Sequence, residues 1–247
     1  PFGWLHAFQL RSSYPTFSIT FHGITFLLHS LPDAVVLYSN KNAGVFMHIP
    51  KLYREEDRAK ITEFIKRHGF PVLVSHDGEK LLATHLPVEV HEGADGSLTI
   101  LGHMSRANPQ WKSFGEQEVL LIFQGAHTYI SPRWYNHVNV PTWNYMNVHA
   151  YGKVRMLEGK ELHDLLSQLV KKHEVDTGYS MEGLPTDMVE KEIRGVAGFS
   201  LLVTRIEAAY KLSQNRDDES YANIVNELEK RGDDDSAKVA HEMKSRR

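Results

Sequence analysis

The clearest pattern in the chain is an alternation of residue types between Thr142 and Leu157. A period of two is typical of a β-strand, whose successive side chains point to opposite faces of a sheet. One face is apolar and predicts packing in a core: Met146, Val148, Ala150, Val154 and Met156. The other face is aromatic and polar: Trp143, Tyr145, Asn147, His149, Tyr151, Lys153 and Arg155. Such a face favours a ligand or a partner subunit over bulk water.

Other strands and helices follow from the same patterning. The stretch 70–90 predicts a β-hairpin around Asp77-Gly78, which is a strong turn signal. Further strands are expected at 97–103, 118–125 and 195–212. Helical spacing and end signals predict helices at 54–69, 160–174, 185–195 and 217–232, and the charged tail 233–247 is expected to fray. Strands gathered first, with helices scattered after them, favour a mainly β (α+β) fold: an antiparallel barrel with peripheral helices.

Residues 1–46 differ from the rest of the chain. Their only charged residues are Arg11, Asp33 and Lys41, and they show no sustained helical or strand period. The first residue is Pro1. We therefore expect Met47 to be the native start, and residues 1–46 to be an N-terminal extension that is not native or is disordered. A genuine extra strand or arm is the alternative.

Composition narrows the possible chemistry. The 247 residues include no cysteine, which excludes disulfides, thiolate catalysis and cysteine-based metal sites. With 28 basic and 31 acidic residues, the net charge of -3 gives no general footprint for nucleic acid, although a local basic patch remains open. No apolar run is long enough to span a membrane, and we expect a cytoplasmic protein. The fifteen histidines are scattered, so we predict no metal site.

The fragment GHMSRANPQW, residues 102–111, gathers hydrogen-bond donors in a tight turn after a predicted strand. The donors come from His103, Ser105, Arg106 and Asn108. A planar guanidinium matches two phosphate oxygens, and the N-terminus of a following helix would add positive partial charge. The fragment predicts either a phosphate-holding turn or, equally, a polar loop in which Arg106 is solvated.

The fragment ATHLP, residues 83–87, contains a proline inside a strand pattern. Because Pro87 removes a backbone donor, this strand is expected at a sheet edge or a bulge. Free N–H and C=O groups on such an edge would match the N1, N3 and N5 edge of a flavin ring.

The fragment KLSQNR, residues 211–216, is polar and basic and directly follows a predicted strand. Its position favours contact with a phosphate or with a neighbouring subunit. Polar residues that lead into a helix are an equal alternative.

Seven fragments stand out along the chain in this order: MHIPKLYREED, ATHLP, GHMSRANPQW, IFQGAHTYISPRWY, VPTWNYMNVHAYG, RGVAGF and KLSQNR. Together they resemble the PaiB family, the so-called FMN-binding negative transcriptional regulators, over roughly residues 47–229. This resemblance implies a split β-barrel similar to pyridoxamine-phosphate oxidase and flavin reductases, with FMN bound between the subunits of a homodimer. Residues 47–247 would then be a single split-barrel domain with C-terminal helices.

The resemblance also implies which residues bind FMN. The ATHLP strand would run along the isoalloxazine, and the turn after it would hold the phosphate; this group is Thr84, His85, Leu86, Pro87, His103, Arg106 and Asn108. From the second subunit, Gln124 and Ser131 would face the cofactor. The flavin slot, or the dimer seam beside it, would be lined by Trp134, Tyr135, Trp143 and Tyr145. Lys211 and Arg216 could close the site.

Three functions remain open from the sequence. The first is an FMN protein with specialised redox chemistry, in which the cofactor transfers electrons and His85 or His103 donates a proton. The second is a regulator that acts on a protein or DNA partner, with FMN as a sensing ligand or without it. The third is a haem-binding protein on the same barrel, suggested by the histidine content.

Overall fold

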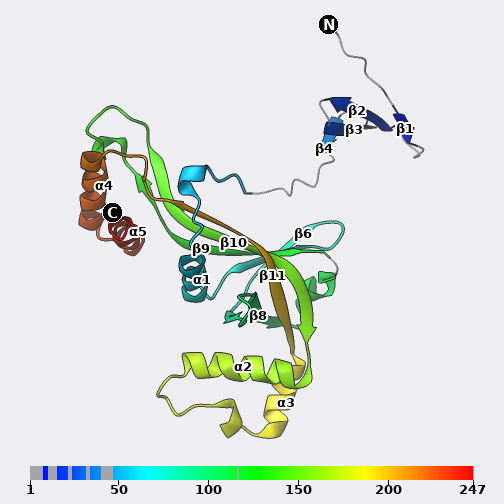
Figure 1. Cartoon of the computed structure of the whole chain (residues 1–247). Coiled ribbons are helices and arrows are strands. Elements are labelled where there is room, and N and C mark those ends of the chain that lie inside the picture. Colours follow the sequence, from blue (N-terminus) through cyan, green and yellow to red (C-terminus); the bar gives the residue numbers. More distant parts are fainter. Residues whose placement is uncertain are drawn as a thin grey trace. The chain divides into compact units, whose positions relative to one another are not determined.

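The computed structural model describes residues 8–10, 16–21, 24–31, 34–39, 47–115 and 117–246 (Figure 1). The chain divides into two compact units, Pro1–Met47 and His48–Arg247. The first unit contains four antiparallel strands in sequential order: β1 (Phe8–Leu10), β2 (Thr16–Phe21), β3 (Ile24–Leu31) and β4 (Ala34–Ser39). These segments show no sustained strand period in the sequence, yet they are rich in β-branched and aromatic residues. That residues 1–46 are not native stays a prediction.

The second unit is built on a seven-stranded antiparallel sheet in the order β6-β5-β9-β10-β11-β8-β7. Its strands are β5 (Val72–His76), β6 (Leu81–His85), β7 (Val88–Glu92), β8 (Leu98–Ser105), β9 (Val119–Ile130), β10 (Thr142–Leu157) and β11 (Val196–Lys211). The hairpin at Asp77-Gly78 is confirmed, with Gly78 at φ +101°. β9 continues to Ile130, five residues beyond the predicted end at Gly125.

The two edges of the sheet approach each other and close it into a barrel. β6 and β7 lie at opposite edges, although only Leu86 and Pro87 separate them in the chain. A short 3₁₀ helix, η2 (Pro109–Ser113), follows β8 and crosses to β5 and β6. Its buried Gln110 donates hydrogen bonds to the carbonyl oxygens of Leu73 (3.3 Å) and Leu82 (3.1 Å). These bonds tie the β8 end of the sheet to the β5–β6 hairpin.

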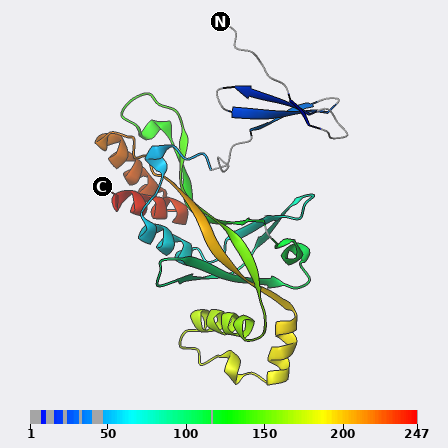
Figure 2. The same ribbon diagram turned by 45° about the vertical axis from the view of Figure 1, so that its right-hand side comes forward.

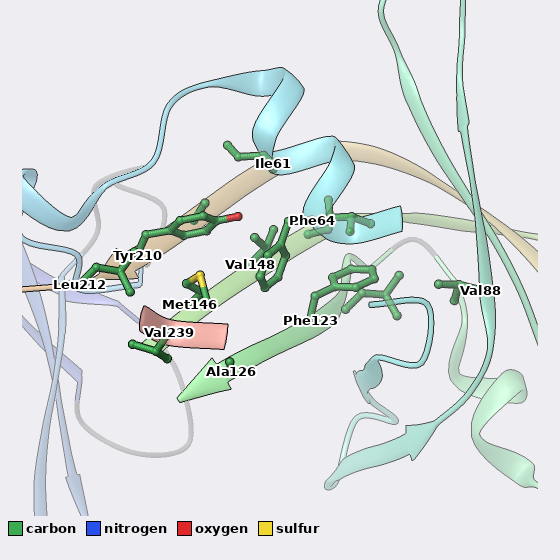
Figure 3. Close-up of a cluster of buried hydrophobic side chains, with 14 of the residues drawn as sticks. Ile61, Phe64, Val88, Phe123, Ala126, Met146, Val148, Tyr210, Leu212 and Val239 are labelled. Atoms are coloured by element: carbon green, nitrogen blue, oxygen red, sulfur yellow. The ribbon is translucent and has the colours of Figure 1, made fainter. Parts of the chain in front are cut away.

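The core lies between the sheet and α1 (Arg58–Arg67). Figure 3 shows Phe64 of α1 beside Val148 and Phe123 of the sheet. The predicted apolar face of β10 is confirmed, since Val148 and Ala150 are fully buried. Burial of each large apolar side chain contributes about 1.5–3 kcal/mol to stability. We call this side of the sheet the core face and the opposite side the outer face.

Four more helices lie at the two ends of the long strands β10 and β11 (Figures 1 and 2). α2 (Gly159–His173) and α3 (Thr186–Arg194) are at one end, and α4 (Asp218–Arg231) and α5 (Asp234–Lys244) are at the other. Near the second end lies η3 (Pro132–Trp134), after β9; two further 3₁₀ turns are η1 (Lys51–Tyr53) and η4 (Met181–Gly183).

Two sequence-based expectations about helix ends were wrong. The predicted helix 54–69 begins only at Arg58, because the Asp57 side chain accepts hydrogen bonds from the first free amides and caps the helix there. The tail does not fray, because α5 forms within it. Asp233 caps α5, and Val239, Ala240 and Met243 are buried against the core.

Candidate functional site

The outer face carries most of the unusual chemistry of the second unit. Strand register places five residues in one row across five strands: His85, Val72, Ile122, His149 and Glu207. The next row is Ala83, Val74, Leu120, Tyr151 and Arg205. An apolar strip on β5 and β9 therefore lies beside a polar cluster on β10 and β11. This is the aromatic and polar face that the alternation of β10 predicts.

The polar cluster is organised around the carboxylate of Glu207, which is only 8% exposed. The Tyr151 hydroxyl donates a hydrogen bond to Glu207 Oε2 at 3.2 Å, and Arg205 Nη1 lies 2.5 Å from Oε1. The Arg205 guanidinium also lies 3.6 Å from the centre of the Tyr151 ring. Burial, together with the nearby Glu207 charge, raises the pKa of Tyr151 and keeps it protonated.

Two polar atoms of β10 on this face are buried without a hydrogen bond within the described chain. They are Asn147 Oδ1 and His149 Nδ1, two residues apart on the strand. Burial lowers the pKa of His149, although the neighbouring Glu207 opposes that shift. A buried polar atom without a partner costs about 1–3 kcal/mol. These atoms therefore mark a place where a ligand or a second chain would complete the hydrogen bonding.

A flavin mononucleotide fits this chemistry. Its isoalloxazine is flat and apolar on its faces, which suits the strip of Val72, Val74, Leu120 and Ile122. Its edge carries both donors and acceptors, which suits the free atoms of Asn147 and His149. Its phosphate requires cations, and two of these lie near the end of β11, where burial and the charge of Arg216 lower the pKa of Lys211.

The first group of predicted residues lies around the closure of the barrel. Asn108 Nδ2 donates to Thr84 Oγ1 at 2.8 Å, and the Thr84 hydroxyl donates to Gln110 Oε1 at 2.5 Å. The Arg106 guanidinium donates to the Val196 carbonyl oxygen at 3.0 and 3.2 Å. The turn is thus held together internally, and its predicted phosphate contact stays a prediction.

The other members of this group differ in exposure. His85 is exposed and lies on the outer face, with its ring stacked on Phe70 at 6.3 Å. Leu86 is 1% exposed, so its side chain belongs to the core and only its backbone could meet a ligand. Pro87 lies between β6 and β7, the two edge strands of the sheet, in agreement with the expected edge position. His103 has a buried Nδ1 atom without a hydrogen-bond partner among the described residues.

The second group of predicted residues lies toward the turn between β9 and β10. We call this turn, residues 131–141, the arm. Register pairs Tyr145 with Lys211, and Gln124 with Asn147. Trp143 is 52% exposed and its ring meets Tyr129 edge to face at 6.1 Å. Ser131 and Trp134 line a pocket between η3 and α4, and the Arg216 guanidinium lies 4.7 Å from the Tyr135 ring.

The two groups do not converge within one chain. Across the sheet, Thr84 is in register with Leu73, Leu121 and finally Ala150 of β10. Along β10, Ala150 is five residues from Tyr145, a member of the second group. At about 3.3 Å per residue, the separation along the strand is about 16 Å. Three residues of these clusters were not predicted from the sequence: Arg205, Glu207 and Gln110. A signal for the first two exists in TRIEAAYK, where Arg205, Glu207 and Lys211 share one strand face.

No three histidine or acidic side chains in the described part of the chain are grouped so as to hold a metal ion. No helix there is long and apolar enough to cross a membrane.

Comparison with known proteins agrees with this fold and with an FMN cofactor. In sequence, the chain is 38% identical over 203 residues to "Protease synthase and sporulation protein PAI 2" of Bacillus subtilis (strain 168), covering 81% of this chain and 98% of that protein. It is 25% identical over 238 residues to the uncharacterized protein AN0679 of Emericella nidulans, covering 80% and 92%.

Among solved structures, the flavocytochrome Anf3 from Azotobacter vinelandii matches with a TM-score of 0.54 and 15% identity, over 71% of this chain and 78% of that chain. This likeness concerns the fold alone, and it confirms the mainly β split barrel with peripheral helices. Residues 47–205 match the family model described as "Putative FMN-binding domain", so the cofactor of this family is the FMN that the sequence predicts. The chain belongs to this FMN-binding, PaiB-like family.

Proposed function

We propose that this protein is a dimeric flavoprotein that holds FMN against the outer face of the sheet and uses it for redox chemistry. The observation that carries the proposal is a pair of buried atoms beside an apolar strip, Asn147 Oδ1 and His149 Nδ1, which have no hydrogen-bond partner among the described residues. When bound, the flavin supplies the electron transfer. The residues of the chain bind and orient it.

Each part of the face has a role in this proposal. The apolar strip on β5 and β9 excludes water from one side of the ring. Asn147 accepts a hydrogen bond from a donor on the ring edge. His149, held mostly neutral by burial, can accept a proton or donate one at a ring nitrogen. Glu207 fixes the position of Tyr151 and Arg205 beside it.

A second copy of the chain would complete the site. Large apolar side chains are exposed around this face, with Phe70 at 63%, Leu81 at 72% and Trp143 at 52%. Covering them would remove apolar surface from water. The two separated groups of predicted residues also support a dimer. The turn at Arg106 of one subunit and the Tyr145–Lys211 pair of the other could then face the same cofactor.

The test is to titrate FMN into the purified full-length chain and to follow quenching of flavin fluorescence. The measurement is repeated for Asn147→Leu and His149→Leu, with the exposed His91→Leu on β7 as the control. Tight stoichiometric quenching, weakened about tenfold by the first two variants and not by the control, supports the site. Equal binding by all variants would refute it. Light scattering with and without FMN tests the dimer.

A regulatory role is the second candidate, favoured by the relative PAI 2, whose name is "Protease synthase and sporulation protein". It would act through a protein or DNA partner, with the same flavin site as a sensor, and we place it in the cytoplasm. Salt-dependent binding to duplex DNA distinguishes direct regulation, because phosphate contacts weaken as salt rises. Haem remains the third candidate, and a Soret band on haem addition would test it.

A further inference from the structure

A pocket of about 680 Å³ lies beside the arm, between η3 and the last two turns of α4. It is separate from the row of His149 and Glu207 on the outer face. Its lining combines three cations, Arg133, Lys230 and Arg231, with the rings of Tyr129, Trp134 and Tyr135. The size is within the usual range for a small-molecule site.

The cations of the pocket differ in how firmly they are held. Arg231 Nη1 donates to Thr128 Oγ1 (2.9 Å) and to the Tyr129 carbonyl oxygen (3.2 Å), and its guanidinium lies 4.9 Å from the Trp134 ring. Lys230 is paired with Glu227 at 2.6 Å. Arg133 is exposed and forms no ion pair within the described residues. One cation is therefore fixed in place and another is available to an incoming anion.

Tyr135 provides an independent sign of a missing partner. Its side chain is only 8% exposed, and its hydroxyl has no hydrogen bond within the part of the chain that the structure describes. A buried tyrosine hydroxyl ordinarily finds a partner, because leaving it unpaired costs stability. A polar ligand atom in the pocket would supply that partner.

We propose that this pocket binds a phosphate-bearing aromatic nucleotide other than FMN. Arg133 and Lys230 would hold the phosphate, since charge-assisted hydrogen bonds to phosphate are strong and a guanidinium can make two. Trp134 and Tyr129 would pack against the flat base. The nearest competing explanation is that Lys230 and Arg231 only offset the partial negative charge at the C-terminus of α4. That explanation accounts neither for Arg133, which comes from η3, nor for the Tyr135 hydroxyl.

The proposal does not depend on the flavin site, and the experiment keeps the two apart. Adenosine monophosphate is titrated by calorimetry into the full-length chain, once as purified and once after saturation with FMN. Inorganic phosphate and adenosine are titrated separately, to resolve the two halves of the ligand. The variants are Arg133→Gln, Lys230→Gln and Tyr135→Phe. Lys160→Gln is the matched control, because that exposed lysine lies on α2 and is paired with Asp164.

We expect saturable binding of the nucleotide with FMN still bound, and about tenfold weaker binding for each pocket variant. The control should bind like the unmodified chain. Three results would overturn the proposal: no binding at millimolar nucleotide, equal weakening in Lys160→Gln, or release of FMN by the nucleotide. The last result would mean that the pocket belongs to the flavin site.

Discussion

His149 and Glu207 face each other across the pairing of β10 with β11, and both side chains lie on the outer face of the sheet. Glu207 is anchored by Tyr151 and Arg205, whereas His149 keeps a buried nitrogen without a hydrogen bond within the described chain. Because Glu207 is already paired with Arg205, its negative charge stabilises the protonated form of His149 only weakly. Burial therefore dominates, and the pKa of His149 is lowered. The result is a mostly neutral histidine on the face where the flavin is proposed to bind.

Stability should fall as the pH drops below about 6.5. Burial lowers the pKa of His68, His103 and His149 below the usual value of 6.5. Between that value and the lower folded pKa, the unfolded chain binds more protons than the folded one, so protons favour unfolding. Urea unfolding at pH 7.5 and pH 5.5 measures the difference. His149→Gln should make the loss of stability smaller. The exposed His91→Gln should leave it unchanged, and an equal effect of the two variants would contradict the assignment.

Gly125→Ala should destabilise the second unit by about 1–3 kcal/mol. A Cβ atom at Gly125 would lie 2.7 Å from the Phe64 ring and 3.1 Å from the Met146 carbonyl oxygen. The ring is fixed in the core by α1 and cannot move aside without strain. Gly115→Ala is the control, since nothing lies within 4 Å of its Cβ position. Chemical denaturation of both variants gives the comparison. Equal denaturation midpoints would show that the core rearranges to accept the added methyl group.

The sequence predicts the strands of the second unit well because their burial alternates regularly. β10 has the predicted bounds, and the hairpin at Asp77-Gly78 forms because the turn chemistry is local. Helix ends depend on single hydrogen bonds, such as the cap made by Asp57, and shift by several residues. α5 was not predicted because its few apolar residues stand among charged ones. The helix is stabilised by the packing of these apolar residues against the core, which the local sequence does not show.

The candidate site was harder to predict than the fold. ATHLP and GHMSRANPQW do meet in space, through the hydrogen bond between Thr84 and Asn108. Their polar atoms, however, largely bond to one another and close the barrel. The contribution of β11 depends on an irregularity at Thr204, where the register shifts and places Arg205 and Glu207 on the outer face. Such a bulge has no clear sequence signal.

Met243→Ala should cost about 2–5 kcal/mol, which is typical of removing a fully buried large side chain. Met243 is fully buried on α5, and its backbone oxygen accepts a hydrogen bond from the Tyr221 hydroxyl at 2.7 Å. Its sulfur also lies 3.5 Å from Asn144 Nδ2 in the sheet. Lys244→Ala on the exposed side of α5 is the comparison, and it should cost less than about 1 kcal/mol. Thermal unfolding distinguishes the two, and a small effect of Met243→Ala would mean that α5 is only loosely attached.

Lys211→Gln should weaken FMN binding about tenfold, or about 1.4 kcal/mol, without reducing the stability of the FMN-free protein. Burial and the charge of Arg216 both lower the pKa of Lys211, so its charge is unfavourable until an anion arrives. Its ammonium group contacts the Thr142 hydroxyl and lies 5.8 Å from the Tyr53 ring, which positions it at the end of β11. FMN titration gives the affinity, urea unfolding of the FMN-free protein gives the stability, and Lys160→Gln controls for the loss of one charge. If Lys211→Gln lowered stability and affinity together, Lys211 would be a structural residue, and the FMN phosphate would have to be held elsewhere, with the turn at Arg106 as the next place to test.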